Sequence, residues 1–590
     1  MNTIKRLKLI VLTLVSNLIF IKTEELKLIN SKICIFDILD IIKNNKCLGY
    51  NNDLVNKNPI DNLYIKKTVN LYWWNKKNLP NVGDYYGKWL LEKMGFKVKY
   101  SKHPELVICG SILGYKVTNY NNTKVWGAGY HYKKQKNPKK EKRIFYAVRG
   151  LLTYNKLKLK YNIALGDPGL LLSKFFQPET SKKYEICIVS HYVDYSWFKK
   201  NFKEKYHIIN MGVNNVEKVA NEINECHFVF SSSLHGIIFA HSLGIPAIHI
   251  KKKKLGSKND FKFKDYYSIL DIRYYNINLN KRKLEEVVKE YIKNKSQYLP
   301  SNKRIKQIQD SLLFTFPYQK MENVICAIAK NENKYINDWC HYHINLGFDN
   351  IYIFDNNDYN TDYIGDYIDD EIKNKVHILN INDKKLQQQN SYNSFYHLFN
   401  HNFKWCAYID IDEFIVLDKW NNISQFVNDK IFKVADIIRL KWHIFGDDNL
   451  ITRPFIQPIY KEINKRILGH KYENQAKSIV KGNLKNVKFK SVHYPLLNFK
   501  VPSQQYLSDG TRKPGSKISI SSQNKEPAYI NHYITKTISE FFEQKLNRGD
   551  AARKRSINID YFWLINKKTK KKQDFIKKKL TKEKVIDTLC

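Results

Sequence analysis

A chain of 590 residues is long enough for more than one domain, and its hydrophobic content of 43% excludes a largely disordered protein. The formal net charge is +44, and lysine carries most of the excess. Arginine, which reads bases and phosphates better, is scarce, so we interpret the charge as a solvated surface and do not favour specific nucleic-acid binding. Such a surface still predicts weak attraction to acidic membranes.

Residues 1–65 form a leader without a chemical motif. Its apolar stretch Leu9–Ile21 follows several basic residues, as in a short signal or signal-anchor segment, but it is short for a membrane span. A buried first strand explains it almost equally well. Both a cytoplasmic and a membrane-associated or lumenal protein therefore stay open. The bias toward Lys, Asn, Ile and Tyr is typical of A/T-rich genomes, including those of large DNA viruses.

The nine cysteines are scattered and form no CxxC pair. This pattern predicts neither a zinc site nor a disulfide framework. Cysteines within apolar runs are interpreted as small buried side chains. These are Cys109, Cys187, Cys326 and Cys406.

Apolar strand-like runs alternate with amphipathic segments over residues 66–300, which predicts a parallel α/β sheet. Polar residues and Pro317 make residues 301–321 a connector. A second α/β region follows at 322–560, and a Lys-rich tail occupies 561–590. We therefore predict two α/β modules.

In the first module, the stretch FVFSSSLHGIIFAHSLGIPAIHI predicts a strand, a Ser-rich turn and a helix that begins near His235. Serine hydroxyls and backbone N–H groups at a helix N-terminus can bind an anion, and a histidine there can act as acid or base. Taken alone, this stretch is explained more simply by a capped helix with a buried histidine.

Six motifs occur in order through this module: NVGDYYGKWLLEKMGF, VICGSIL, VWGAGY, AVRGLLT, LGDPGLLL and SSLHGIIFAHSLGIPA. Over residues 66–275 they resemble a polysaccharide pyruvyl transferase domain. The resemblance implies a GT-B-like pair of Rossmann-type halves that transfers pyruvate from phosphoenolpyruvate to sugar hydroxyls. It implies that Arg149 binds the donor phosphate or carboxylate. It also implies that His235 protonates the donor methylene or steadies the departing phosphate.

The same resemblance assigns supporting roles to other polar residues. Asn81, Gly83 and Asp84 would shape the donor or acceptor edge, Asp167 would organise the site, and Ser233 would contact substrate. The sequence departs from the family at Ser111, where a glycine often stands, and this serine narrows access to the backbone.

In the second module, a predicted strand, a helix closed by Gly347 and a strand that ends at Asp355 form one βαβ unit. Asp355 would therefore lie at the carboxyl edge, where open α/β sheets bind ligands. The stretch YIDIDEFIVL follows in another apolar strand. Alternation along an extended strand predicts that Asp410 and Asp412 project together and that Glu413 faces the other way. Paired carboxylates suit Mg²⁺ or Mn²⁺, although a salt-bridged strand end is an equally good interpretation.

These motifs, with INHYITKTISEFFEQKLNRGDAA, resemble family 92 and related family 2-like glycosyltransferases over residues 322–560. Such enzymes are GT-A-type and use nucleotide sugars. The resemblance implies a divalent metal that neutralises the donor diphosphate. The implied metal ligands are Asp410, Asp412 and His532, and the implied nucleoside contacts are Asn331, Glu332 and Asp355.

Transfer with inversion needs a carboxylate to deprotonate the acceptor hydroxyl. Asp447 and Asp448 in WHIFGDDNL are the candidates, with Trp442 as a platform for the sugar. The tandem aspartates fit an ordinary turn equally well.

We therefore predict an α/β protein with two Rossmann-like modules, GT-B-like and GT-A-type, that modifies glycans. Its expected partners are a nucleotide sugar, phosphoenolpyruvate and a glycan or glycoprotein acceptor, with Mn²⁺ or Mg²⁺ as cofactor. One alternative is that one module is a non-catalytic carbohydrate-binding domain. A basic nucleic-acid-binding protein is a less favoured alternative.

Overall fold

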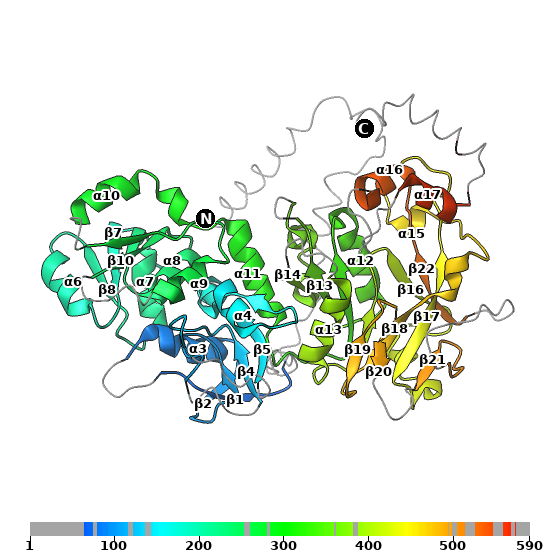
Figure 1. The fold of residues 1–590 in the computed structure, drawn as a ribbon, viewed down its shortest axis with the longest axis horizontal. Coiled ribbons are helices and arrows are strands. Elements are labelled where there is room, and N and C mark those ends of the chain that lie inside the picture. Colours follow the sequence, from blue (N-terminus) through cyan, green and yellow to red (C-terminus); the bar gives the residue numbers. More distant parts are fainter. Residues whose placement is uncertain are drawn as a thin grey trace, which may run out of the picture. The chain divides into compact units, whose positions relative to one another are not determined.

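A computed structural model gives the fold (Figure 1). It describes residues 64–74, 80–115, 122–135, 143–252, 260–279, 284–358, 361–381, 387–493, 495–497, 504–513, 526–546, 558–567 and 573. The apolar stretch Leu9–Ile21 and most of the Lys-rich tail lie outside the described residues. Within the described residues, no helix combines the length and apolarity needed to cross a membrane. The described residues belong to one compact unit, in which we distinguish an N-terminal lobe (residues 64–300) and a C-terminal lobe (residues 321–567).

The N-terminal lobe contains two sheets in which all paired strands are parallel. The first has six strands in the order β2-β1-β3-β4-β5-β6, and the second has five in the order β11-β10-β9-β7-β8. Their strands are β1 (Thr68–Leu71), β2 (Lys97–Tyr100), β3 (Leu106–Val107), β4 (Thr123–Trp126), β5 (Arg143–Val148), β6 (Ala164–Leu165), β7 (Tyr184–Ser190), β8 (His207–Asn210), β9 (Cys226–Ser231), β10 (Ala247–Lys251) and β11 (Asn276–Asn278). The prediction of parallel α/β structure is confirmed, and the two sheets agree with the pair of Rossmann-type halves that the resemblance implied.

Helices connect these parallel strands, as crossover connections require. Asn81 caps α3 by accepting a hydrogen bond from Gly83 N (3.1 Å), a favoured way to begin a helix. The helices of this lobe are α3 (Val82–Lys93), α4 (Leu151–Leu157), α5 (Leu172–Phe175), α6 (Tyr195–Phe202), α7 (Val216–Asn224), α8 (Leu234–Ser242), α9 (Phe261–Tyr267) and α10 (Leu284–Ile292), with a 3₁₀ turn η5 (Pro168–Leu171).

One cysteine prediction is wrong. Cys187 in β7 and Cys226 at the start of β9 form a disulfide, with Cα atoms 5.9 Å apart. The two cysteines are 39 positions apart in the sequence, and only the pairing of β7 with β9 brings them together. Cys109, Cys326 and Cys406 are buried and free, as predicted.

The C-terminal lobe is built on one mixed sheet, in the order β14-β13-β12-β15-β18-β17-β22-β16, with β21 beside β17. The first four strands are parallel, and antiparallel pairing begins at β18. The strands are β12 (Asn323–Ala329), β13 (Asn350–Asp355), β14 (Val376–Asn380), β15 (Trp405–Tyr408), β16 (Glu413–Leu417), β17 (Ile437–Ile444), β18 (Ala476–Lys481), β21 (Gln505–Leu507) and β22 (Ala528–His532). A separate pair joins β19 (Val487–Phe489) and β20 (Pro495–Leu497).

Helices again connect the parallel strands of this sheet, and short helices follow its antiparallel part. They are α12 (Asn333–Asn345), α13 (Gln388–Phe399), α14 (Ile423–Val427), α15 (Ile459–Glu462), α16 (Ile538–Glu540) and α17 (Ile559–Ile565), with a 3₁₀ turn η10 (Lys430–Phe432) and a π-helical turn η12 (Phe541–Leu546). The predicted βαβ unit is confirmed as β12, α12 and β13, with Asp355 as the last residue of β13.

The predicted connector is instead a packed helix, α11 (Asn302–Phe314), which Ser301 caps by accepting from Arg304 N (3.1 Å). The α11 helix lies beside β14 and also contacts β6 (Figure 1). Trp126 of β4 donates to Leu312 O (2.9 Å), and Phe314 packs among aromatic rings of the C-terminal lobe. The core that contains α11 therefore includes residues of both lobes.

We expect Phe314→Ala to lower the free energy of unfolding by about 3–5 kcal/mol, since this ring is fully buried against Tyr352 and Phe354. Because both lobes share this core, denaturant unfolding followed by tryptophan fluorescence should keep a single transition at a lower midpoint. Ile456→Ala is the control, because Ile456 is 82% exposed. If Phe314→Ala lowered the free energy of unfolding no more than Ile456→Ala does, the shared core would be contradicted.

Candidate active sites

The first candidate site lies where α3 and α8 begin in the N-terminal lobe. His235 lies in the first turn of α8, and its Nε2 is 3.7 Å from Asp167 Oδ1. Its ring rests on Gly83, where an added Cβ would come within 2.1 Å of His235 Nδ1. Within the described part of the chain, His235 Nε2 and Asp167 Oδ2 are buried without hydrogen-bond partners. Such atoms need a partner that the protein itself does not supply, such as water or a ligand.

Asp84 lies in the first turn of α3, beside this histidine. Its carboxylate accepts a hydrogen bond from Asn81 Nδ2 (2.7 Å). Burial raises the pKa of Asp84, while His235, Asn81 and Lys262 act in the opposite direction. The structure thus brings Asn81, Asp84 and His235 together, and their roles toward a substrate stay predictions. The raised pKa suits a carboxylate that takes up a proton.

Most hydroxyl groups of the serine turn before α8 already form hydrogen bonds with backbone groups of the protein. Ser231 Oγ donates to Val189 O (2.9 Å) and accepts from Ser233 N (3.0 Å). Ser232 Oγ accepts from His191 N (3.0 Å). Ser233 is the N-cap residue of α8, but its side chain makes no capping bond. Of the three predicted hydroxyls, that of Ser233 is therefore the best placed for substrate.

Arg149 follows β5 and is fully buried. Its Nε donates to Asp265 Oδ2 (3.1 Å), Nη1 to Ser111 Oγ (2.8 Å) and Nη2 to Tyr130 O (2.5 Å). Nη2 also forms an ion pair with Asp265 Oδ2 at 3.0 Å. These contacts use most of the five N–H groups, so Arg149 mainly fixes the surrounding loops. Ser111, the departure from the family pattern, is one of its acceptors. Direct contact of Arg149 with the donor stays a prediction.

Lys262 is the residue of this site that sequence reasoning missed. It lies on α9 three residues before Asp265, close to Asp84 and Asp194. Burial and Arg149 lower the pKa of Lys262 to about 8, while the two aspartates act in the opposite direction. No hydrogen bond or ion pair fixes its ammonium among the described residues. In the sequence it is one of many lysines, and we interpreted the excess of lysine as a solvated surface.

The second candidate site lies at the carboxyl edge of the parallel strands in the C-terminal lobe. Asp355 ends β13, and the acidic residues follow β15, with β12 between the two strands. Both acidic points therefore lie at the same carboxyl edge of the sheet. Asp355 is buried and accepts from Asn357 N (3.0 Å) and Asn380 Nδ2 (3.4 Å). Burial raises its pKa to about 6.

The prediction that Asp410 and Asp412 lie in one extended strand is wrong. The strand β15 ends at Tyr408, the chain turns at Ile411 and Asp412, and β16 begins at Glu413. Glu413 N donates to Asp410 O (3.1 Å), and Asp410 N donates to Glu413 Oε2 (2.9 Å). Because of this turn, Glu413 points back toward Asp410 instead of away from it.

Buried lysines neutralise the acidic turn. Lys477 of β18 lies 2.9 Å from Asp410 Oδ2 and 3.5 Å from Glu413 Oε2. Lys545 of η12 donates to Asp412 Oδ2 (3.1 Å) and to a backbone carbonyl. Burial would raise the pKa of Asp412, but Lys545 and His532 hold it well below its usual range. Burial, Asp410 and Asp412 raise the pKa of Glu413.

A second buried ion pair joins the loop after β12 to the segment after β22. Glu332 Oε2 lies 2.7 Å from Lys536 Nζ, which also donates to Gln544 Oε1 (2.9 Å). Gln544 in turn donates to Asn331 O (3.0 Å). Asn331 and Glu332 are thus near the acidic turn, but their contacts within the protein already use much of their bonding capacity.

Trp442, at the end of β17, lies beside His532, with ring centroids 4.3 Å apart. Its Nε1 is buried without a hydrogen-bond partner among the described residues. Asp447 and Asp448 form a turn. Asp447 Oδ1 accepts from Asn449 N (3.2 Å), and Asp448 pairs with Lys465 at 3.0 Å. The turn interpretation explains both aspartates, and their role as a catalytic base stays a prediction.

The acidic turn does not fit a divalent cation in this arrangement. Both oxygens of Asp410 and both of Asp412 already contact an N–H or O–H group. Among the described residues, one group of three potential metal ligands has its ligand atoms close to one another. It consists of His341, Asp369 and Glu371. These three lie near the surface, and His341 already pairs with both acids at 2.9 and 3.4 Å.

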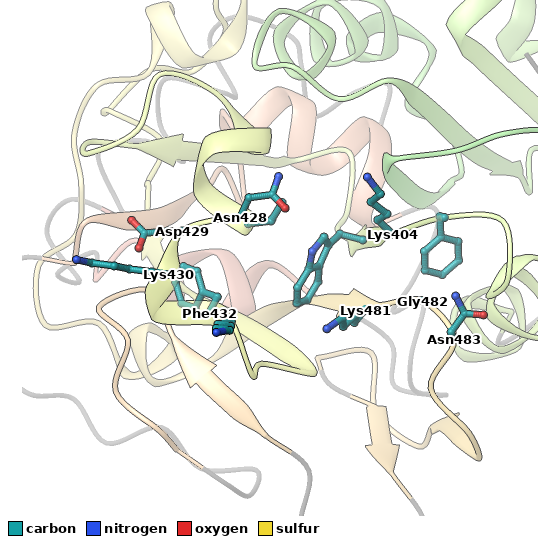
Figure 2. Close-up of a pocket in the computed structure, with 12 residues that line it drawn as sticks. Lys404, Asn428, Asp429, Lys430, Phe432, Lys481, Gly482 and Asn483 are labelled. Atoms are coloured by element: carbon teal, nitrogen blue, oxygen red, sulfur yellow. The ribbon is translucent and has the colours of Figure 1, made fainter. Parts of the chain in front are cut away.

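An open pocket of about 500 Å³ lies elsewhere in the C-terminal lobe (Figure 2). It surrounds the start of β15, whereas the acidic turn follows the end of that strand. Its basic lining residues are Lys404, Lys430, Lys433 and Lys481. The pocket contains none of the predicted site residues and is separate from the acidic turn.

Comparison with known proteins gives two matches. Residues 41–251 match the family model for polysaccharide pyruvyl transferase. The chain is also 34% identical over 229 residues to Uncharacterized protein L143 of Acanthamoeba polyphaga mimivirus, which covers 35% of this chain and 76% of the relative. The match to the family model ends at residue 251, within the N-terminal lobe, and does not reach the C-terminal lobe.

Asp355→Asn should change how stability depends on pH. A carboxyl group with a pKa of about 6 when folded and about 3.9 when unfolded costs the folded state about 2–3 kcal/mol as pH rises between these values. The wild type should therefore lose stability from about pH 4 to pH 6 relative to Asp355→Asn, as measured by urea unfolding. Asp358→Asn, at an exposed carboxylate, is the control. If the free energies of unfolding of wild type and Asp355→Asn changed with pH in parallel, the raised pKa of Asp355 would be contradicted.

Proposed function

We propose that the site in the N-terminal lobe transfers pyruvate from phosphoenolpyruvate to two hydroxyls of a glycan or glycoprotein, because residues 41–251 match the family model for polysaccharide pyruvyl transferase. The observation that carries this proposal is the group formed by His235, Asp84 and Lys262. It combines an acid, a base and a cation without a fixed partner at the start of two helices. Phosphoenolpyruvate carries two anionic groups, and helix N-termini and cations suit anions.

The reaction needs one proton donor and one proton acceptor. Protonation of the donor methylene makes C2 electrophilic, and one sugar hydroxyl adds there. Inorganic phosphate then leaves with the C2–O bond electrons, and a second hydroxyl closes a cyclic ketal. The overall exchange converts phosphoenolpyruvate and a diol into a pyruvyl ketal and phosphate, with no change of oxidation state.

The side chains of the cleft match these needs. His235 Nε2 lacks a partner among the described residues, so it can deliver the proton to the methylene. Asp84, with its raised pKa, can accept a hydroxyl proton. Lys262 can pair with the phosphate or carboxylate. Asp167 orients His235, and Arg149 holds α9 so that Lys262 stays in the cleft.

Lys262→Met should weaken phosphoenolpyruvate binding by about 1.5–3 kcal/mol, the scale of a hydrogen bond to a charged group. Wild-type binding should weaken as pH rises through about 8, because Lys262 then loses its proton. Isothermal titration measures both effects, and phosphate release with a galactose- or mannose-containing acceptor measures turnover. Lys264→Met, at an exposed position of the same helix, should behave as wild type. Wild type that binds no phosphoenolpyruvate would refute pyruvyl transfer.

For the C-terminal lobe we propose sugar transfer from a nucleotide sugar. The family match does not extend to this lobe, so the proposal rests on its sheet. Asp355 lies at the carboxyl edge with a raised pKa, which is typical of a residue kept for binding despite its cost in stability. Asp355 would accept hydrogen bonds from the nucleoside, and Trp442 would support the sugar.

A nucleotide sugar should raise the melting temperature of the whole chain, and Asp355→Asn should abolish that shift. A thermal-shift screen of nucleotide sugars measures the effect, and Asp358→Asn serves as the control because its carboxylate is exposed. If no nucleotide sugar shifts the wild type, the C-terminal lobe is better explained as a binding domain for the glycan.

A further inference from the structure

We propose that the C-terminal lobe binds its nucleotide donor without a divalent metal, with Lys477 and Lys545 in the place of the cation. This inference rests on the proposed sugar transfer, and it replaces the metal that the sequence resemblance implied.

The first reason is that the carboxylate oxygens are already bonded. Asp410 Oδ1 accepts from Gln388 Nε2 and from Tyr392 Oη (3.1 Å), and Asp410 Oδ2 faces Lys477 at 2.9 Å. Asp412 Oδ2 accepts from Lys545 (3.1 Å), and its Oδ1 lies 3.5 Å from His532 Nε2. A metal would have to displace these groups, because it binds through the same oxygens.

The second reason is charge. Lys477 is 1% exposed, and the side chain of Lys545 is 11% exposed, so neither ammonium can swing into water to make room. A divalent cation between Asp410 and Asp412 would lie beside both ammonium groups, and water would hardly screen the repulsion. Lys477 and Lys545 offset the charges of Asp410 and Asp412, and the raised pKa of Glu413 favours its neutral form, so the turn has little excess negative charge to attract a cation.

The third reason is that several buried N–H donors near the acidic turn have no acceptor among the described residues. A lysine has three N–H donors. Lys477 faces two carboxylates and Lys545 has two acceptors, so each retains one donor. Trp442 Nε1, which can only donate, is buried without an acceptor in the described part of the chain. Unused donors call for a ligand with acceptor oxygens, such as a diphosphate. The side chain of Asp410 is 30% exposed, so a ligand can approach the acidic turn from the side of this residue.

Two measurements on the full chain test the proposal. The first is electron paramagnetic resonance of free Mn²⁺ titrated with protein. Wild type should leave the Mn²⁺ signal unchanged, whereas Lys545→Met, which frees Asp412, should gain Mn²⁺ affinity by about tenfold or more. Lys481→Met changes a lysine of the pocket on the same strand as Lys477 and should behave as wild type.

The second measurement is the melting temperature with uridine or guanosine diphosphate, in EDTA and in Mn²⁺. We expect the same shift in both buffers, reduced in Lys477→Met. A shift that needs Mn²⁺, or stoichiometric Mn²⁺ binding by wild type that Asp412→Asn abolishes, would overturn the proposal. If neither nucleotide nor any nucleotide sugar shifts the wild type, sugar transfer fails. The Mn²⁺ titration of the wild type still decides whether the protein binds the metal, and Asp412→Asn then shows whether any bound Mn²⁺ is at the acidic turn.

Discussion

The ion pair between Arg149 and Asp265 is the interaction on which the N-terminal cleft depends. Both side chains are fully buried, and two charges that leave water must be completely bonded to each other and to their surroundings. That requirement fixes Tyr130, Ser111 and the position of α9. The cleft residue Lys262 is on the same helix as Asp265, so the buried pair also decides where that cation stands. A structural arginine thus positions the lysine that we propose binds the donor.

In the C-terminal lobe, lysines pair with the buried carboxylates, as Arg149 does in the N-terminal lobe. Lys477, Lys536 and Lys545 are each buried against a carboxylate at the edge of the sheet. Each pair orders a loop or turn that a parallel sheet leaves unsupported where its strands end. In both lobes, the buried charges therefore hold the ligand edge of the sheet in shape. They also explain why strand-end acids survive beside Ile, Val and Leu without unpaired charge.

Local patterns in the sequence predicted the local structure well. Alternating apolar runs indicated the parallel strands, and the position of Asp355 followed from the end of one such run. The failures concern contacts between distant residues. The turn at Ile411–Asp412 is stabilised by Glu413 and Lys477, and no pattern within YIDIDEFIVL reveals a lysine 65 positions later. Lys262 was missed for the same reason, because its chemistry comes from Asp84 and Arg149. The bond between Cys187 and Cys226 likewise depends on strand order.

The helix α11 has a consequence for how such a chain can arise and change. Its 13 residues complete the packing of sheets on both sides, through Trp126 in one direction and Phe314 in the other. A recombination event that separated the two lobes would give this helix to only one descendant, and the other would expose the surface that the helix had covered. Exchange of one lobe for a homologue would need matched changes at the helix.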